Sequence, residues 1–241
     1  MHISVFGASG GIGGYVVELA AEHGHDVRAV YRAAPRVPPA GPAETLVAPD
    51  IFDPAFAAEA VRGADVVVSA VGANFSTRHN PRTAMTSPPD LHQRMARTLI
   101  TAIRDAAPSA RLICVSTGSM GPADNVMGPL PRLLFRFLGT VVIPNLRRVG
   151  RDSRAMEEEL SASGLDWYAL RPVKLTDGPR TGNVQASDQF RMKTVSRADV
   201  AWQIVALAED PVPDMARTPV ITTGAGSSIS PQAAGRAMRP A

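Results

Sequence analysis

Two kinds of hydrophobic pattern alternate along this chain. Ile3 and Val5 begin a short apolar stretch that ends at Gly7, and apolar residues then recur with a helical period over residues 12–23. Gly24 ends this predicted helix as a C-terminal cap. Further extended segments are predicted at 26–31, 45–47, 64–72, 111–116, 167–170 and 219–222, and further helices at about 56–61, 90–107, 152–163 and 195–208. This alternation predicts repeated β-α-β units, and therefore an α/β fold with a doubly wound parallel sheet.

The organisation of the chain follows from the same pattern. Residues 64–72 are continuously apolar, as expected of a strand covered on both faces in the middle of a parallel sheet. We expect a single domain over residues 1–223, with a proline-rich surface loop at 33–43 and a flexible C-terminal tail at 224–241. Residues 119–150 are the one long irregular connection, and we expect them to form a loop or lid on the substrate side.

Composition and charge exclude several classes of protein. The chain is 45% hydrophobic and 20% charged, as in ordinary globular domains, and its net charge is +3. The positive charge gathers in one patch between residues 132 and 154, so we expect no nucleic-acid partner. No secretion signal and no apolar run of membrane-spanning length is evident, so we expect a cytoplasmic protein without a membrane partner.

The cysteine and histidine content argues against disulfides and metals. Cys114 is the single cysteine and lies in a predicted strand, so we expect a small buried apolar residue in a reducing compartment. His79 and His92 have no second ligand at metal-binding spacing, and lone histidines are usually surface residues. We therefore expect no metal site.

A glycine-rich turn carries the clearest chemical signal. Gly7, Gly10 and Gly13 form Gly-x-x-Gly-x-x-Gly between a predicted strand and a predicted helix. Such glycines let the backbone approach a pyrophosphate, and the helix N-terminus supplies free N–H groups to hold it. The alternative, a merely flexible loop, does not explain why strand, spacing and helix occur together. The predicted nucleotide-binding residues are Gly7, Ala8, Ser9, Gly10, Gly11, Ile12 and Gly13.

Arg32 follows the second predicted strand, where dinucleotide-binding proteins place an acidic residue if they bind the 2′-hydroxyl of NAD. A guanidinium there would instead pair with a 2′-phosphate. NADP(H) is therefore favoured, while NAD(H) stays possible. The alternative is that Arg32 is an ordinary solvated arginine.

The succession of motifs resembles a known family. It resembles atypical short-chain dehydrogenases/reductases, in the NAD(P)H-binding branch that contains biliverdin-IXβ reductase (flavin reductase) and NmrA-like NADP sensors. The resemblance implies an NAD(P)-binding Rossmann-like fold over residues 1–223. Its motifs are Phe6-Gly7-Ala8-Ser9-Gly10-Gly11-Ile12-Gly13, Val30-Tyr31-Arg32, Pro49-Asp50-Ile51, Val68-Ser69-Ala70-Val71-Gly72, Val115-Ser116-Thr117-Gly118, Ser163-Gly164-Leu165-Asp166-Trp167, Leu170-Arg171-Pro172 and Ser196-Arg197-Ala198-Asp199-Val200-Ala201.

The resemblance also implies roles at matching positions. Cofactor contacts are expected from Asp50 and Ile51 at the adenine edge, Ala70, Val71 and Gly72 along the adenosine and its ribose, and Pro172 and Val173 near the nicotinamide. Val71 and Val173 fit equally well in the core. The family keeps a hydroxyl near the nicotinamide, so we expect Thr117 to donate a hydrogen bond to the substrate, with Ser116 as second choice. Alternatively, the pair caps the strand's backbone.

One departure from the family affects the expected chemistry. Standard short-chain enzymes use Tyr-x-x-x-Lys to protonate a carbonyl, whereas Tyr15, Tyr31 and Tyr168 are followed four positions later by leucine, proline and proline. Ordinary ketone reduction thus lacks its acid. The helix that would carry this pair is predicted to begin at about Asp152, with Asp152 or Ser153 as its N-cap.

The missing pair suits conjugated acceptors, because their delocalised electrons let solvent deliver the proton. We therefore predict an NADPH-dependent reductase of a small conjugated molecule such as a flavin, quinone or tetrapyrrole. Arg132 and Arg136 are expected in a lid over a flat anionic acceptor, although a packing helix or dimer surface fits them too. The alternative function is a non-catalytic NADP(H)-binding redox sensor. Sugar-nucleotide or steroid chemistry is disfavoured, and the acceptor and oligomeric state are open.

Overall fold

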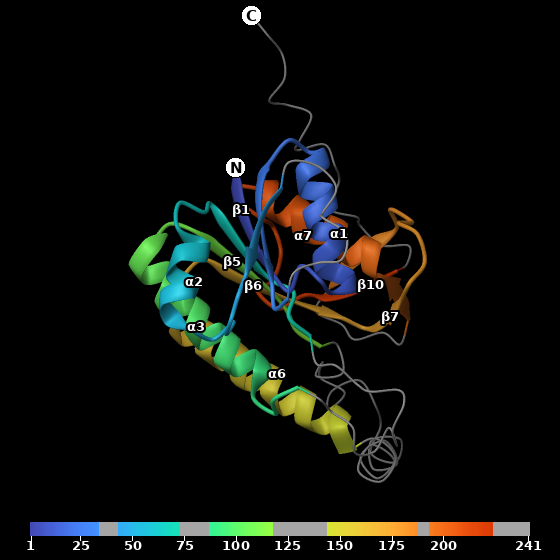
Figure 1. Cartoon of the computed structure of the whole chain (residues 1–241). Coiled ribbons are helices and arrows are strands. Elements are labelled where there is room, and N and C mark those ends of the chain that lie inside the picture. The colour runs from blue at the N-terminus through green and yellow to red at the C-terminus, as the bar shows by residue number, and fades with distance from the viewer. Residues whose placement is uncertain (34–42, 73–86, 118–143, 188–192, 224–241) are drawn as a thin grey trace, which may run out of the picture.

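The computed structural model describes residues 1–33, 43–72, 87–117, 144–187 and 193–223. Its main sheet has eight strands in the order β3-β2-β1-β4-β5-β6-β10-β8 (Figure 1). Neighbouring strands are parallel except for β10 and β8, which are antiparallel. The strands are β1 (His2–Phe6), β2 (Asp26–Tyr31), β3 (Ala43–Val47), β4 (Val66–Ser69), β5 (Arg111–Val115), β6 (Trp167–Pro172), β8 (Val184–Ser187) and β10 (Val220–Thr223). The predicted doubly wound parallel sheet is confirmed.

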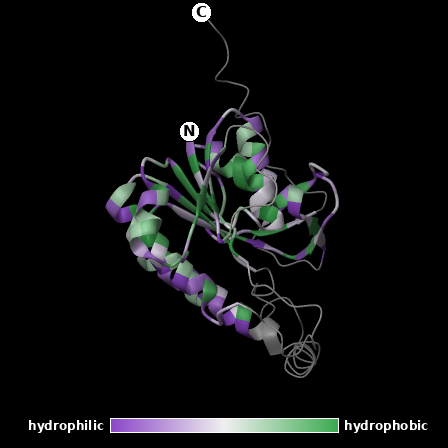
Figure 2. Cartoon of the chain, in the orientation of Figure 1, coloured by the Kyte–Doolittle hydropathy of each residue, from purple (hydrophilic) through white to green (hydrophobic). Residues whose placement is uncertain are grey.

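Helices cover both faces of the sheet. On one face α1 packs against α7, and on the other α3 lies between α2 and α6 (Figure 1). Each layer encloses its own cluster of buried apolar residues. Figure 2 shows hydrophobic residues concentrated in the central strands and hydrophilic residues along the outer sides of the helices. The helices are α1 (Gly11–Glu22), α2 (Pro54–Val61), α3 (Leu91–Ala106), α6 (Pro144–Ala162) and α7 (Arg197–Glu209).

The strand order positions the functional site. β1 pairs with β2 on one side and with β4 on the other, so the direction in which the chain builds the sheet reverses at β1. All four residues of β4 are buried, as its continuous apolar sequence predicts. In open parallel sheets, ligands bind at such a switch point, outside the carboxyl ends of the strands.

The structure differs from the sequence-based prediction in two places. α6 begins at Pro144, eight residues before the predicted start, so Asp152 and Ser153 lie inside the helix and the predicted N-cap is wrong. Residues 144–150, the end of the segment 119–150 that was predicted to be irregular, are therefore helical, and Gly150 is buried within α6. The short strands β7 (Lys174–Thr176) and β9 (Thr194–Ser196) pair as a small second sheet, and together with β8 they were not predicted.

Several predictions fall on other parts of the chain. His79, Arg132, Arg136, most of the loop at 119–150 and the tail at 224–241 lie outside the described residues. The expectation that Cys114 is a buried residue is confirmed, because its side chain is buried in β5. Within the described ranges no helix combines the length and apolar character needed to cross a bilayer.

Candidate functional site

A cavity of about 480 Å³ opens at the switch point, beyond the carboxyl ends of β1, β2, β4 and β5. This volume is typical of small-molecule and cofactor sites. Eleven of the residues singled out from the sequence line it: Gly7, Ser9, Gly10, Gly11, Ile12, Arg32, Ile51, Ala70, Val71, Gly72 and Ser116. The structure therefore brings the glycine turn, the arginine after β2 and the end of β4 to one cavity.

The glycine turn is built for close backbone contacts. Gly7 has φ +83°, and a Cβ on it would lie 2.8 Å from the carbonyl carbon of Ala70. A Cβ on Gly13 would overlap the carbonyl oxygen of Gly7, because α1 packs directly against the turn. The N–H of Gly10 closes the turn on the Gly7 carbonyl at 2.9 Å. Side chains are excluded at Gly7 and Gly13, which leaves backbone groups facing the cavity.

The start of α1 fits an anionic group. Gly10 is the N-cap and makes no side-chain cap hydrogen bond, and the first turn of the helix contains no acidic residue. The first N–H groups of a helix need an acceptor, and the helix dipole favours negative charge there. A dinucleotide pyrophosphate satisfies both requirements at this position.

Two arginines add positive charge to the cavity. Arg32 follows β2 and is exposed. Arg197, the first residue of α7, lies beside the turn, where its side chain would be displaced by a Cβ on Gly11. Its guanidinium pairs with Asp177, whose side chain is 90% exposed. The sequence analysis assigned Arg197 no role. A cation in the first turn of a helix interacts unfavourably with the helix dipole, so its presence there indicates a second interaction for its side chain.

A buried histidine and aspartate form a second polar feature of the wall. His92 lines the cavity, and its Nδ1 lies 2.7 Å from Oδ2 of Asp152. Their side chains are 8% and 4% exposed. The prediction that His92 is a surface residue is therefore wrong. The error arose because Asp152 lies 60 residues away in sequence and its helix was predicted to begin there.

Asp152 also holds the start of α3. Its carboxylate accepts hydrogen bonds from the backbone N–H groups of His92 at 2.8 Å and Gln93 at 3.0 Å. Asp90, the local N-cap residue, makes no side-chain cap bond. Asp152 is thus a helix cap, as its residue type suggested, but for a neighbouring helix instead of its own.

Ser116 bonds to an ion pair formed by the buried Glu157 and the half-buried Arg171. Its Oγ donates to Oε1 of Glu157 at 2.7 Å, and Glu157 accepts two hydrogen bonds from the guanidinium of Arg171. A hydroxyl has one proton to donate, so Ser116 in this arrangement offers acceptor lone pairs to the cavity. This geometry does not suit Ser116 as a substrate donor.

Cys114 lies in β5, close to Glu157 of this ion pair. Burial, and to a smaller extent the charge of Glu157, raises the pKa of its thiol to about 12. A thiol with that pKa stays protonated at neutral pH, and thiolate is the nucleophilic form. Cys114 is therefore a packing residue.

Six of the predicted site residues do not line the cavity: Ala8, Gly13, Asp50, Thr117, Pro172 and Val173. Ala8 and Gly13 are buried beneath the turn. Asp50 is exposed, and its Oδ1 accepts the N–H of Phe52 at 2.9 Å, so it shapes its own loop. The expected cofactor contacts of Asp50, Pro172 and Val173, and the expected hydrogen bond from Thr117, stay predictions.

Known proteins share this architecture. A family model described as NAD(P)H-binding matches residues 7–211. The uncharacterized protein YwnB of Bacillus subtilis (strain 168) is 26% identical over 189 residues, covering 77% of this chain and 78% of that protein. ChuY from Escherichia coli O157:H7, named as an anaerobillin reductase, has a TM-score of 0.68 and 25% identity, covering 95% of this chain and all of ChuY.

A proposed NADH-flavin reductase from Streptococcus pneumoniae TIGR4 has a TM-score of 0.69 at 21% identity, with coverage of 93% and 100%, and this likeness concerns the fold alone. The family model spans most of the described domain, and the strand order and the glycine turn agree with it. The chain therefore belongs to the NAD(P)H-binding family of Rossmann-fold proteins, as the resemblance in its sequence predicted.

Proposed function

We propose that this protein is an NADPH-dependent reductase of a small conjugated acceptor, such as a flavin, quinone or tetrapyrrole. The observation that carries the proposal is that the glycine turn and Arg32 line one cavity at the switch point of the sheet. Bound NADPH supplies a hydride. The acceptor takes that hydride and one proton, which yields reduced acceptor and NADP⁺.

The residues of the cavity divide the binding of NADPH among them. The first turn of α1 holds the pyrophosphate through its backbone N–H groups. Arg32 pairs with the 2′-phosphate, which an acidic residue at this position would repel. Arg197 adds a second cation beside the turn, so that the cofactor's charge is compensated on two sides.

The proton is the second requirement of the reaction, and His92 is suited to provide it. His92 lines the cavity, and Asp152 accepts a hydrogen bond from its Nδ1, which leaves Nε2 as the second exchangeable nitrogen. A carboxylate in this position fixes the orientation and the tautomer of the ring. His92 would thus do part of the work that Tyr-x-x-x-Lys does in standard short-chain enzymes.

Two residues near β5 are assigned different parts in this proposal. Ser116 presents acceptor lone pairs to the cavity, since its proton is donated to Glu157. Thr117 follows it and remains our choice as the donor to the substrate. Arg132 and Arg136 remain our choice for contacts with an anionic acceptor.

The likeness to ChuY, which is named as an anaerobillin reductase, supports a reductase with a conjugated acceptor. This chain and ChuY are 25% identical, and the match covers the whole of ChuY. The lack of Tyr-x-x-x-Lys supports the same class, but it also fits a sensor that binds NADP(H) without turnover. The two functions differ in one observable property, which is the oxidation of the cofactor.

The test is NADPH oxidation, followed by absorbance, against free flavins, biliverdin and quinones, with NADH as the parallel donor. Faster loss of NADPH with one acceptor supports the reductase and identifies the acceptor class. NADH oxidised as fast as NADPH contradicts the assigned role of Arg32. Saturable NADPH binding without turnover on any acceptor contradicts the reductase and favours the sensor.

A further inference from the structure

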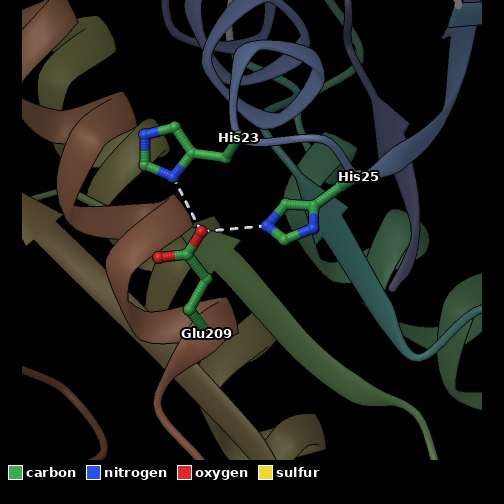
Figure 3. A group of neighbouring side chains, drawn as sticks. All are labelled: His23, His25 and Glu209. Atoms are coloured by element: carbon green, nitrogen blue, oxygen red, sulfur yellow. Dashed lines mark hydrogen bonds and ion pairs between the residues drawn. The ribbon is translucent and has the colours of Figure 1, made fainter. Parts of the chain in front are cut away.

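A cluster of two histidines and one glutamate lies outside the proposed active site (Figure 3). Nδ1 of His23 is 2.7 Å and Nε2 of His25 is 2.9 Å from the same oxygen, Oε1 of Glu209. The potential ligand atoms of the three side chains lie within 4.8 Å of one another. Glu209 is 186 residues from His23 in sequence, so the cluster is formed by the fold.

The end of α1 fixes both histidines. The N–H of His25 bonds to the carbonyl of Ala20, and the N–H of Gly24 bonds to that of Ala21, with Gly24 at φ +79°. These are the two hydrogen bonds of a Schellman motif, which ends a helix in one defined conformation. His23 and His25 therefore flank a rigid turn and point toward the same carboxylate, as Figure 3 shows.

The electrostatic environment of the cluster favours a positive charge. α1 and α7, both fully described, end beside the cluster, and neither has a Lys or Arg in its last turn. Helix C-termini carry partial negative charge, and Glu209, the last residue of α7, adds a full one.

We propose that His23, His25 and Glu209 bind a divalent transition-metal ion of the zinc type. Two imidazole nitrogens and one carboxylate are a common ligand set for zinc, and water can complete the coordination. Tetrahedral bonds of about 2.1 Å place ligand atoms about 3.4 Å apart. The carboxylate oxygen must then move away from the two ring nitrogens by about 0.5–0.7 Å. The side chains of His23 and Glu209, 37% and 27% exposed, allow this movement.

The proposed ion would link the C-terminal ends of two helices. α1 and α7 both begin at the cavity, with Gly11 and Arg197, and both end at the cluster. The length of α1 separates the two places by about 18 Å. Metal binding should therefore raise stability without taking part in hydride transfer. This proposal revises the sequence-based expectation that the chain has no metal site.

The test uses the full chain after treatment with a chelator and dialysis. Zn²⁺ should raise the melting temperature, and Co²⁺ should produce the visible absorption bands of a tetrahedral site with nitrogen and oxygen ligands. His23→Gln, His25→Gln and Glu209→Gln should each weaken Zn²⁺ binding at least about tenfold. His2→Gln is the matched control, because His2 is an exposed histidine with one carboxylate, Asp26, at 3.5 Å. It should bind Zn²⁺ as the parent does.

Three results would overturn the proposal: no change in melting temperature with Zn²⁺, equal Zn²⁺ affinity in the parent and His25→Gln, or an equal loss in His2→Gln. Circular dichroism of each variant separates loss of a ligand from loss of the fold. NADPH oxidation should be the same with and without Zn²⁺. A cluster that serves as a proton-dependent ion pair would show stability that responds to pH and not to Zn²⁺.

Discussion

Nδ1 of His92, at the start of α3, lies 2.7 Å from Oδ2 of Asp152 in the middle of α6. This contact joins two helices of one layer at the wall of the cavity. It serves two purposes, since Asp152 caps α3 and also orients the imidazole of His92, a residue that lines the cavity. The two roles can be separated by substituting His92 and leaving Asp152 unchanged.

We expect His92→Gln to lower kcat for the preferred acceptor by about 10²-fold, the lower range for loss of a general acid, because solvent still delivers protons. KM for NADPH should change little, since the glycine turn and Arg32 hold the cofactor. Steady-state kinetics with both substrates varied gives the answer. His2→Gln, at an exposed histidine outside the cavity, is the control. An unchanged kcat in His92→Gln would remove His92 from the mechanism.

Arg32→Ala should raise KM for NADPH by about 10–100-fold, the effect of losing charge-assisted hydrogen bonds worth about 1.5–3 kcal/mol. KM for NADH should stay the same, because NADH has no 2′-phosphate. Parallel kinetics with the two donors measures the difference. Arg62→Ala is a suitable control, since Arg62 is an exposed arginine paired with Glu59 on the surface. Equal losses for both donors would mean that Arg32 does not read the 2′-phosphate.

Gly13 and Gly14 are adjacent glycines with opposite tolerance for a side chain. A Cβ on Gly13 would overlap the Gly7 carbonyl, while one on Gly14 would lie 3.5 Å from the Ala8 carbonyl, an ordinary contact. Gly13→Ala should therefore cost about 1–3 kcal/mol of stability and abolish NADPH binding. Gly14→Ala should be neutral or stabilising by up to about 1 kcal/mol, because alanine favours a helix. Denaturant melts and fluorescence titration test both, and equal effects would contradict the assigned packing.

The sequence predicted the features that depend on local pattern. β4 lies within the predicted segment 64–72, because a continuous apolar run is typical of a central parallel strand. The turn at Gly7 was predicted because the glycines have a fixed spacing between a strand and a helix. The ends of elements were harder. The start of α6 was predicted eight residues too late, because its first turns were included in the irregular segment 119–150.

The contacts that the sequence missed are those between distant segments. His92 with Asp152, and His23 with Glu209, are 60 and 186 residues apart, and each residue alone has the appearance of a surface residue. Arg197 gave a weak signal through its position at a helix start, which needed the fold to be interpreted. Long-range pairs of this kind follow from the strand order, and no periodicity in the chain encodes them.

Asp166 joins three elements of the fold on the edge away from the cavity. Its carboxylate accepts hydrogen bonds from Arg111, at the start of β5, and from Arg217, before β10. Burial alone would raise the pKa of Asp166, but the hydrogen bonds and charges of Arg217 and Arg111 outweigh it and lower the pKa. A carboxylate with a lowered pKa contributes stability above its unfolded pKa, about 3.9, and loses that contribution as the pH falls through the folded value.

We expect Asp166→Asn to lower the free energy of unfolding by about 1 kcal/mol at pH 7, a small value because the side chain is 40% exposed and solvent screens its charge. At a pH below the folded pKa the carboxylate of the parent is protonated, so the parent and the variant should converge there. Urea denaturation from pH 7 down to acid pH measures how the free energy of unfolding of the parent and of the variant depends on pH. Asp26→Asn, at a side chain 78% exposed and paired with His2, is the control and should follow the parent throughout. A constant difference between Asp166→Asn and the parent at every pH would show that the two arginines stabilise the fold without depending on this charge.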